Sequence, residues 1–585
     1  MSLIKKLGWF FKLEKRRYLL GIIALALVSI LNLVPPRVMG NIIDTITSKS
    51  LTNAQLFLNV FYLVGAGLAM YALRYIWRIY IFGTANHLAR ILRFRLFEQF
   101  TKMSPSFYQR YRTGDLMAHA TNDINAVTMT AGGGVMSAVD ASITALVTLA
   151  TMFFVLDWRL TLIAILPLPI MALGTSRLGR RNHAAFKNAQ EAFSNLNNKV
   201  QESVSGIRVT KSFGYQTAEV EAFAAINQDV YEKNRLSAKW NALFDPMTLT
   251  FVGLSYVLTL IFGGRFISAG QLTIGELVTF ITYLDMLVWP LQAMGFLFNV
   301  IQRGSVSYDR IEKLLAEESD IQESEAPLTN IENGDLTYAI DSFVYDQQEI
   351  LSDIHFSLKK GQTLGIVGPT GSGKTTLLKL LLRERDVEQG HISLDGHDIR
   401  DYKLQDLRGL MGYVPQDQVL FAMSIQDNIC FANSALPDQV VEMAAKLCGV
   451  YDDILAMPDG FDTIIGERGV SLSGGQKQRL AMSRALAIDP EILMLDDSLS
   501  AVDAKTEHLI VENLKSERIG KTTIITAHRL SAIVHADLIL VLENGHIIER
   551  GTHQELLALN GWYAQTYQSQ QLTKSLEESL EGGAK

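Results

Sequence analysis

The sequence TLGIVGPTGSGKT, residues 363–375, joins an apolar run to a glycine-rich loop. Residues 363–367 have the composition of a buried strand, and the run from 376 to 382 has the pattern of a helix. The loop between them fits G-x-x-x-x-G-K-[ST], in which backbone N–H groups turn toward phosphate oxygens and the helix N-terminus adds a favourable dipole. The sequence therefore predicts a phosphate-binding loop formed by Gly368, Pro369, Thr370, Gly371, Ser372, Gly373, Lys374, Thr375 and Thr376.

Two side chains of this loop have separate predicted roles. Lys374 should reach the β- and γ-phosphates of a nucleotide, and the Thr375 hydroxyl should bind Mg²⁺. A second apolar strand, Ile492–Leu495, ends in Asp496 and Asp497. A carboxylate at the end of a strand beside a phosphate loop is the expected partner of Mg²⁺. We therefore expect Asp496 to act as a metal ligand.

The composition away from this loop indicates a membrane protein. Of 585 residues, 48% are hydrophobic and only 19% are charged, whereas soluble chains carry about 25% charged residues. The net charge of -7 disfavours binding to nucleic acid, and two cysteines are too few for a disulfide-stapled secreted scaffold.

The apolar residues concentrate in the first half of the chain, in segments long enough to cross a bilayer. An even number of spans places both ends of this region on the same side. Basic residues before the first span, and in the connections at 85–130 and 177–239, predict that both termini are cytoplasmic. The six predicted spans are Tyr18–Leu33, Leu56–Phe82, Val135–Leu156, Leu160–Leu173, Leu243–Ile267 and Leu277–Val300.

The expected fold class is an α-helical transmembrane domain, with six spans and long cytoplasmic extensions, fused to an α/β P-loop nucleotide-binding domain. Proline-free connections with apolar residues at three- to four-residue spacing predict the extensions. Short apolar strands that alternate with helices predict the α/β domain. The expected boundaries are a cytoplasmic segment 1–17, a membrane domain 18–303, an acidic linker 304–333, a nucleotide-binding domain 334–567 and a flexible tail 568–585.

Between the phosphate loop and the Asp pair lies LSGGQ, residues 472–476. This motif resembles the signature of ATP-binding-cassette (ABC) proteins, and nearly the whole chain resembles a half-transporter of the exporter type (type IV exporter fold). The resemblance implies ATP and Mg²⁺ as cofactors. It also implies that the signature loop contacts ATP held by a second subunit, because two domains placed head to tail sandwich two nucleotides. The residues concerned are Ser473, Gly474, Gly475 and Gln476.

Further roles follow from the same resemblance. Tyr345 resembles the aromatic residue that stacks on adenine, and Gln416 resembles the residue that links Mg²⁺ to the membrane domain. His528 resembles the switch histidine that contacts the γ-phosphate. Ser500–Asp503 resembles the dimer-contact loop, and Gly466–Gly469 resembles a loop typical of exporters.

The sequence departs from the family pattern at Asp497, where the family usually has Glu as the general base. Asp is shorter by one C–C bond, about 1.5 Å, and a misplacement of about 1 Å can lower a rate by on the order of 10²-fold. This chain's own loop is therefore expected to bind ATP well and hydrolyse it poorly. With an intact signature, this pattern is similar to the degenerate-site subunit of bacterial heterodimeric multidrug exporters. A harmless variant, or a homodimer, is the alternative.

Two cytoplasmic segments resemble the coupling helices of such exporters, Tyr111–Leu116 and Gly214–Glu219, with an ordinary helix hairpin as the alternative. Within the spans, ionisable residues are costly and often functional. Asp140 and Asp285 are therefore candidates for attracting a cationic cargo, although a structural hydrogen bond explains them equally well.

The expected function is ATP-driven export of amphipathic drugs or other lipophilic compounds across the cytoplasmic membrane of a bacterium, as one half of a heterodimeric exporter. The expected partners are a second half-transporter subunit, membrane lipids and the small amphipathic substrate, with no nucleic acid. A lipid or peptide exporter is the alternative within transport, and a membrane-bound ATP sensor is the alternative outside it. A peptide exporter often carries an N-terminal cysteine protease, whereas no cysteine precedes Cys430 here.

Overall fold

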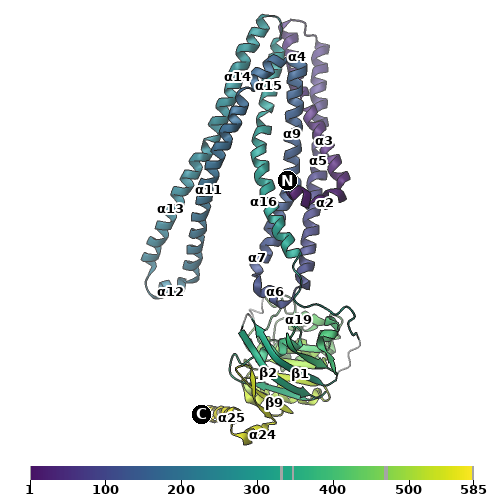
Figure 1. Cartoon of the computed structure of the whole chain (residues 1–585), viewed down its shortest axis with the longest axis vertical. Coiled ribbons are helices and arrows are strands. Elements are labelled where there is room, and N and C mark those ends of the chain that lie inside the picture. Colours follow the sequence, from purple (N-terminus) through teal and green to yellow (C-terminus); the bar gives the residue numbers. More distant parts are fainter. Residues whose placement is uncertain (1, 330–333, 346–347, 467–471, 583–585) are drawn as a thin grey trace. The chain divides into compact units, whose positions relative to one another are not determined.

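The computed structural model of the chain describes residues 2–329, 334–345, 348–466 and 472–582. It divides into two compact units. The first unit holds Met1–Thr101 and Thr113–Glu317, and the second holds Lys102–Arg112 and Glu318–Lys585. The first unit is helical and the second contains two β-sheets (Figure 1), so the predicted fold class is confirmed.

Among the residues that the structure describes, six helical segments are long and apolar enough to cross a membrane, in agreement with the predicted number of spans. Each predicted span falls within one of these segments. In chain order they are α3 and α4 (Lys15–Leu31, Val34–Thr47), α5 (Asn53–Lys102), α7 to η3 (Thr113–Leu156), α10 and α11 (Trp158–Ile165, Pro167–Ser205), α13 and α14 (Gln216–Ala242, Phe244–Ser268), and α15 and α16 (Ile274–Met286, Val288–Leu315).

These helices are much longer than a bilayer requires. The 50 residues of α5 correspond to about 75 Å at 1.5 Å per residue, whereas the hydrocarbon core is about 30 Å thick. The long helices α11 and α13 pack side by side and are joined through the short helix α12 (Ile207–Ser212) (Figure 1). The helices therefore extend well beyond the membrane.

Small residues allow two of the membrane helices to approach closely. A Cβ added to Gly275 of α15 would lie 2.0 Å from the carbonyl oxygen of Gly40 in α4, so only glycine fits there. The Thr279 hydroxyl next to this contact donates to the carbonyl oxygen of Pro36 at 3.1 Å. The α4–α15 pair therefore joins the first and last spans through backbone contact.

Helices extend across two of the predicted boundaries. The expected linker begins at residue 304, but α16 continues to Leu315 because Tyr308, Ile311 and Leu314 form a buried stripe at helical spacing. The expected flexible tail begins at residue 568, but α25 (Trp562–Gly582) is helical there. Residues 568–581 contain no proline or glycine, and most of them are good helix formers.

The second unit contains an antiparallel sheet and a mainly parallel sheet. The four-stranded antiparallel sheet has the order β2-β1-β4-β5, and the six-stranded sheet has the order β10-β9-β3-β8-β7-β6. In the second sheet only β10 runs antiparallel to its neighbour. The strands are β1 (Leu336–Tyr345), β2 (Gln348–Leu358), β3 (Thr363–Val367), β4 (Gln389–Leu394), β5 (His397–Asp398), β6 (Met411–Val414), β7 (Ile492–Asp496), β8 (Thr522–Thr526), β9 (Leu538–Glu543) and β10 (His546–Gly551).

Two apolar clusters hold these sheets and their helices together. One packs the antiparallel sheet and α17 (Lys374–Leu381) against one face of the parallel sheet. The other packs the helices of the opposite face, including α22 (Gly474–Ala487) and α23 (Ala504–Glu517), against β7, β8 and β9. Strands buried on both faces explain the continuous apolar runs in β7 and β9.

Candidate functional site

The strand order gathers most of the predicted nucleotide residues at one edge of the parallel sheet. Strands β3, β8, β7 and β6 are adjacent and parallel, so their carboxyl ends lie at the same edge. The phosphate loop follows β3, His528 follows β8, Asp497 follows β7 and Gln416 follows β6. The carboxyl edge of a parallel sheet is where such folds bind ligands.

The phosphate loop has the backbone that its glycines predict. Gly368 and Gly373 have φ values of +147° and +101°, in the region that favours glycine. A Cβ on Gly368 would lie 2.0 Å from the carbonyl oxygen of Leu542, and a Cβ on Gly373 would lie 2.5 Å from the Leu351 side chain. Larger residues at these two positions would therefore displace the loop.

The loop fits a phosphate ligand in two further respects. The Lys374 ammonium, at the start of α17, donates to the carbonyl oxygens of Gly368 and Pro369, each at 2.9 Å, so it lies across the loop. Burial lowers the pKa of Lys374, while the carboxylates of Asp497 and Asp496 oppose that shift. The Ser372 hydroxyl is buried and makes no hydrogen bond within the described residues, so it has capacity for a phosphate oxygen.

Asp496 is the centre of a buried hydrogen-bond network at the end of β7. Its carboxylate accepts from Thr375 at 3.0 Å, from Thr526 at 2.7 Å and from Tyr413 at 3.3 Å. Thr375 and Asp496, two of the three predicted Mg²⁺ ligands, are therefore already in contact. Their oxygen donors have the chemistry that Mg²⁺ prefers, with nucleotide oxygens completing the shell.

Asp497 is held by its backbone. Its N–H lies 3.0 Å from the Thr526 hydroxyl and 3.1 Å from the Thr526 carbonyl oxygen. Its φ of +46° lies in the left-handed region, which Asp tolerates better than most residues. The side chain is half-buried, and its negative charge acts on Lys374. Asp497 therefore lies beside the phosphate loop.

His528 and Gln416 lie at the same edge with exposed side chains. The backbone carbonyl oxygen of His528 accepts from the Gln570 side chain at 2.9 Å. The backbone carbonyl oxygen of Gln416 accepts from Gln418 at 2.8 Å. In both residues the backbone carbonyl is hydrogen-bonded and the side chain is exposed.

Tyr345 lies at the end of β1, in the antiparallel sheet. The guanidinium of Arg385 stacks over its ring, 4.2 Å from the centroid, and its hydroxyl donates to Gln109. One face of the ring is therefore occupied by a cation, and adenine stacking would use the other face.

The signature loop forms the N-terminus of α22 and makes no hydrogen bond to the phosphate loop within the described residues. Ser473 and Gln476 form a capping box, in which each side chain accepts from the other's backbone N–H, at 3.3 Å and 3.0 Å. The neighbouring Gln478 side chain accepts from the Ala501 N–H at 3.0 Å, which joins the signature helix to the predicted dimer-contact loop. Of the predicted exporter loop Gly466–Gly469, only Gly466 lies within the described residues.

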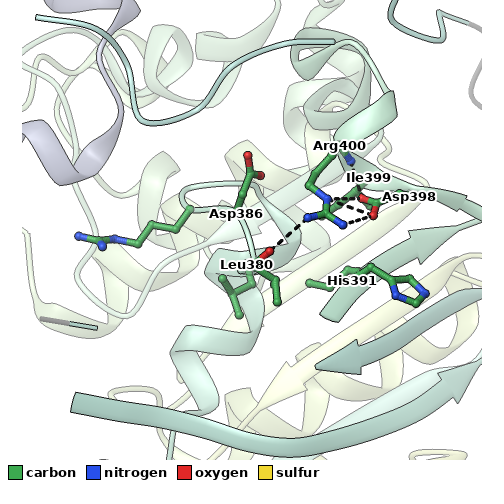
Figure 2. Close-up of a pocket in the computed structure, with 9 residues that line it drawn as sticks. Leu380, Asp386, His391, Asp398, Ile399 and Arg400 are labelled. Carbon is green, nitrogen blue, oxygen red and sulfur yellow. Dashed lines mark hydrogen bonds and ion pairs between the residues drawn. The ribbon is translucent and has the colours of Figure 1, made fainter. Parts of the chain in front are cut away.

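A small pocket elsewhere in this unit is a poor candidate for the nucleotide. Figure 2 shows Arg400 paired with Asp398 in its wall, at 2.6 Å. Burial raises the pKa of Asp398, but hydrogen bonds from Arg400 outweigh it and hold the pKa below its usual range. None of the predicted nucleotide residues lines this pocket, and its charged pair is already satisfied.

The two candidate cargo residues each have a hydrogen-bond partner within the membrane unit. Asp140 accepts from the Trp289 indole at 3.3 Å, and Asp285 accepts from the Tyr256 hydroxyl at 3.1 Å. These bonds favour the structural interpretation of both carboxylates.

The predicted coupling segments lie at breaks between helices. Tyr111–Leu116 contains the break between α6 (Pro105–Arg110) and α7 (Thr113–Ala118). The short helix thus precedes the predicted segment, since Pro105 at its N-terminus and extended Tyr111 fix its ends. Lys102–Arg112 groups with the second unit, where Ser106 donates to Asp320. The predicted Gly214–Glu219 starts in the turn after α12, where Gly214 has a φ of +63°.

Two family models match the chain. One describes the ABC transporter transmembrane region and matches residues 18–291. The other describes an ABC transporter and matches residues 351–500, which include the phosphate loop, the signature loop and the Asp496–Asp497 pair. The chain belongs to the ABC transporter family. It is therefore a multi-pass membrane protein that binds ATP through its second unit and couples ATPase chemistry to transport.

Relatives cover the whole transporter. It is 45% identical to the probable multidrug resistance ABC transporter ATP-binding/permease protein YheI of Bacillus subtilis, over 100% of this chain and 99% of that protein. It is 34% identical to the ATP-dependent lipid A-core flippase of Syntrophus aciditrophicus, over 82% of this chain and 80% of that protein. The chain also resembles the solved structure of a bacterial Atm1-family ABC exporter with ATP bound. The TM-score is 0.79 and the sequence identity is 27%, and the match covers 95% of this chain and 98% of that chain. The transporter thus has the exporter fold.

Several residues at this site were not predicted from the sequence. Thr526 binds both Asp496 and the Asp497 backbone, and Tyr413 binds Asp496. Thr526 directly precedes Ala527 and His528, so its place in that motif was a usable signal. Tyr413 and Gln570 carry no local signal, because their contacts join segments far apart in the chain.

Proposed function

We propose that this chain is one half of a heterodimeric ABC exporter that uses ATP and Mg²⁺ to export amphipathic drugs or other lipophilic compounds across the cytoplasmic membrane of a bacterium. Both termini would lie in the cytoplasm. The observation that carries the proposal is Asp497 in the position of the catalytic Glu, on a domain whose Ser473–Gln476 signature is complete.

The residues at the sheet edge have a consistent division of roles toward ATP. Lys374 would move from the loop carbonyls to the β- and γ-phosphates, while the glycine-rich backbone holds their oxygens. Thr375, Asp496 and Gln416 would hold Mg²⁺. His528 would contact the γ-phosphate, and Tyr345 would stack on adenine. When bound, Mg²⁺ would neutralise charge on the phosphate oxygens as the γ-phosphoryl group passes to water and ADP leaves.

Hydrolysis at this chain's own loop would be slow. A general base must lie within about 3 Å of the oxygen of the water that it deprotonates. The Asp497 carboxylate ends about 1.5 Å short of a Glu carboxylate on the same backbone. The backbone is held by Thr526, so Asp497 cannot easily advance to close the gap. Binding and occlusion of ATP would persist at this site while turnover is reduced.

The signature loop would serve ATP held by the partner. Its backbone N–H groups at the start of α22 suit a phosphate, and its capping box fixes their direction. The link from Gln478 to Ala501 would carry changes at the partner's ATP to the dimer-contact loop. Efficient hydrolysis in the complex would thus occur at the site that pairs this signature with the partner's Glu.

Exposed apolar residues at the tip of the α11–α13 hairpin support a second subunit. Phe213 is 82% exposed, and Val209 and Tyr215 are 62% and 61% exposed. Apolar residues gathered at the end of an extended hairpin are typical of a surface that another protein covers. The nucleotide-binding domain of the partner is the proposed occupant.

The substrate class rests on the relatives. YheI carries a multidrug resistance name, and the Syntrophus relative is a lipid A-core flippase. Both cargo types are amphipathic, so a lipid exporter is the second candidate. Neither of these two relatives is named as a peptide exporter or an ATP sensor, so these two alternatives have less support. The hydrogen-bonded state of Asp140 and Asp285 favours an apolar route over recognition of cations.

The test is transport by the reconstituted pair. The chain would be co-expressed with a second half-transporter that carries Glu at its base position, and the pair would be placed in liposomes. We expect ATP added outside to drive uptake of a fluorescent amphipathic dye into these liposomes, with little uptake by this chain alone. Movement of labelled lipid but not dye would favour the lipid exporter. Equal activity of this chain alone would rule out the heterodimer.

A further inference from the structure

The C-terminal helix α25 holds the loop that carries His528. The Gln570 side chain donates through Nε2 to the carbonyl oxygen of His528 at 2.9 Å, and its Oε1 accepts from the N–H of Leu530 at 3.0 Å. One planar amide therefore binds the backbone on both sides of Arg529. Two bonds from one rigid group fix the direction of the loop as well as its position.

The start of α25 is firmly anchored, so Gln570 has a fixed base. Tyr563 is fully buried, its hydroxyl lies 2.7 Å from His553 in α24 (His553–Leu559), and its N–H donates to Glu549 of β10 at 3.2 Å. Gln570 lies seven residues further on and shares the face of Tyr563. Figure 1 shows α24 and α25 at the C-terminal end of the chain. The face of α25 that is anchored through Tyr563 therefore also places Gln570 against the loop that carries His528.

The other flank of the loop is held independently. Arg529 and Ser531 both donate to the buried carboxylate of Glu507 in α23. The loop backbone is therefore restrained from two helices, while the imidazole of His528 remains exposed. The restrained backbone lowers the conformational freedom of the loop. Less entropy is therefore lost when the exposed imidazole binds a ligand.

We propose that Gln570 is a positioning residue that orients His528 toward the γ-phosphate, so that α25 helps this site to distinguish ATP from ADP. This inference rests on the proposed role of His528. ADP lacks the γ-phosphate, so its binding does not use His528. Loss of Gln570 therefore lowers affinity for ATP and leaves affinity for ADP unchanged, whereas general damage to the domain lowers both.

The experiment measures ATP and ADP affinities of the full-length chain in detergent, by competition with a fluorescent nucleotide. Gln570→Ala is expected to weaken ATP binding about three- to tenfold, as loss of one or two hydrogen bonds implies, with ADP binding unchanged. Gln570→Glu keeps the volume and the acceptor for Leu530 but loses the donor to His528, and should act in the same direction. The control is Gln571→Ala, whose exposed side chain lies on the next position of the helix.

His528→Ala separates this inference from the proposed function. If His528→Ala lowers the ATP-to-ADP preference and Gln570→Ala does not, Gln570 has no positioning role. Equal losses of ATP and ADP affinity in both Gln570 variants would also overturn it. If His528→Ala itself leaves the preference unchanged, the proposed γ-phosphate contact is wrong. In the His528→Ala background, Gln570→Ala should have no further effect on that preference.

Discussion

The buried carboxylate of Glu507 accepts a hydrogen bond from Arg529 at 3.1 Å, and Arg529 also donates to the carbonyl oxygen of Val502 at 3.1 Å. Val502 belongs to the predicted dimer-contact loop, and Arg529 directly follows His528. Through Glu507 and Arg529, the loop that would meet the partner is bonded to the loop that would meet the γ-phosphate.

Glu507→Ala should destabilise the second unit by about 1–3 kcal/mol, because it leaves Arg529 and Ser531 without their acceptor. Glu507→Gln retains a hydrogen-bond acceptor and should destabilise the unit less. Thermal unfolding of the full-length protein measures both. Glu517→Ala, at an exposed position in the same helix, is the control and should have little effect. An unfolding temperature for Glu507→Ala equal to that of the wild type would contradict the importance of this contact.

Lys374→Ala should weaken ATP binding at this chain's loop by about tenfold or more, since a charged partner of the β- and γ-phosphates is lost. Equilibrium binding of ATP to the full-length chain is the measurement. Lys360→Ala, an exposed lysine of the same unit, should leave affinity unchanged. Retained affinity in Lys374→Ala would refute the role of the lysine.

Asp497→Asn should lower steady-state ATPase of the heterodimer less than about twofold, because Asp497 is already a poor base. Removal of the partner's Glu should lower it by on the order of 10²-fold or more. Each pair is purified with one subunit changed. Comparable losses from the two substitutions would mean that both sites hydrolyse ATP and that the asymmetric arrangement is wrong.

Ser473→Arg should nearly abolish ATPase of the pair, because a bulky cation would block the turn that faces the partner's ATP. Ser473→Ala is the matched control, since it loses only the capping bond to the Gln476 N–H, at a cost of about 1 kcal/mol. ATPase of the purified pair distinguishes the two. Strong activity in Ser473→Arg would show that this signature does not serve hydrolysis.

A cysteine at residue 50 should react with a membrane-impermeant maleimide in intact cells, because six spans with cytoplasmic termini place the α4–α5 connection outside. Background labelling of the native cysteines should be low. Both native cysteines are buried, and burial raises the pKa of Cys448 to about 12, which depletes its reactive thiolate. Ser434→Cys, in the second unit, should react only after lysis. The reverse labelling pattern would show that the second unit lies outside the cell and that the predicted topology is wrong.

The sequence by itself determined the features that depend on neighbouring residues. The six spans follow from the length of apolar runs, and the phosphate loop follows from glycines whose positive φ values at Gly368 and Gly373 are local properties. The capping box of Ser473 and Gln476 is likewise local, since its bonds span three residues. Such signals need no knowledge of distant segments.

Only the tertiary structure decided which of these pieces meet. The order β3-β8-β7-β6 places the phosphate loop, His528, Asp497 and Gln416 at one edge, although these residues are dispersed along the chain. The contact of Gln570 with His528 also depends on the tertiary structure. The reason is physical: periodicity records which face of an element is apolar, whereas a hydrogen bond between distant segments depends on how those faces pack.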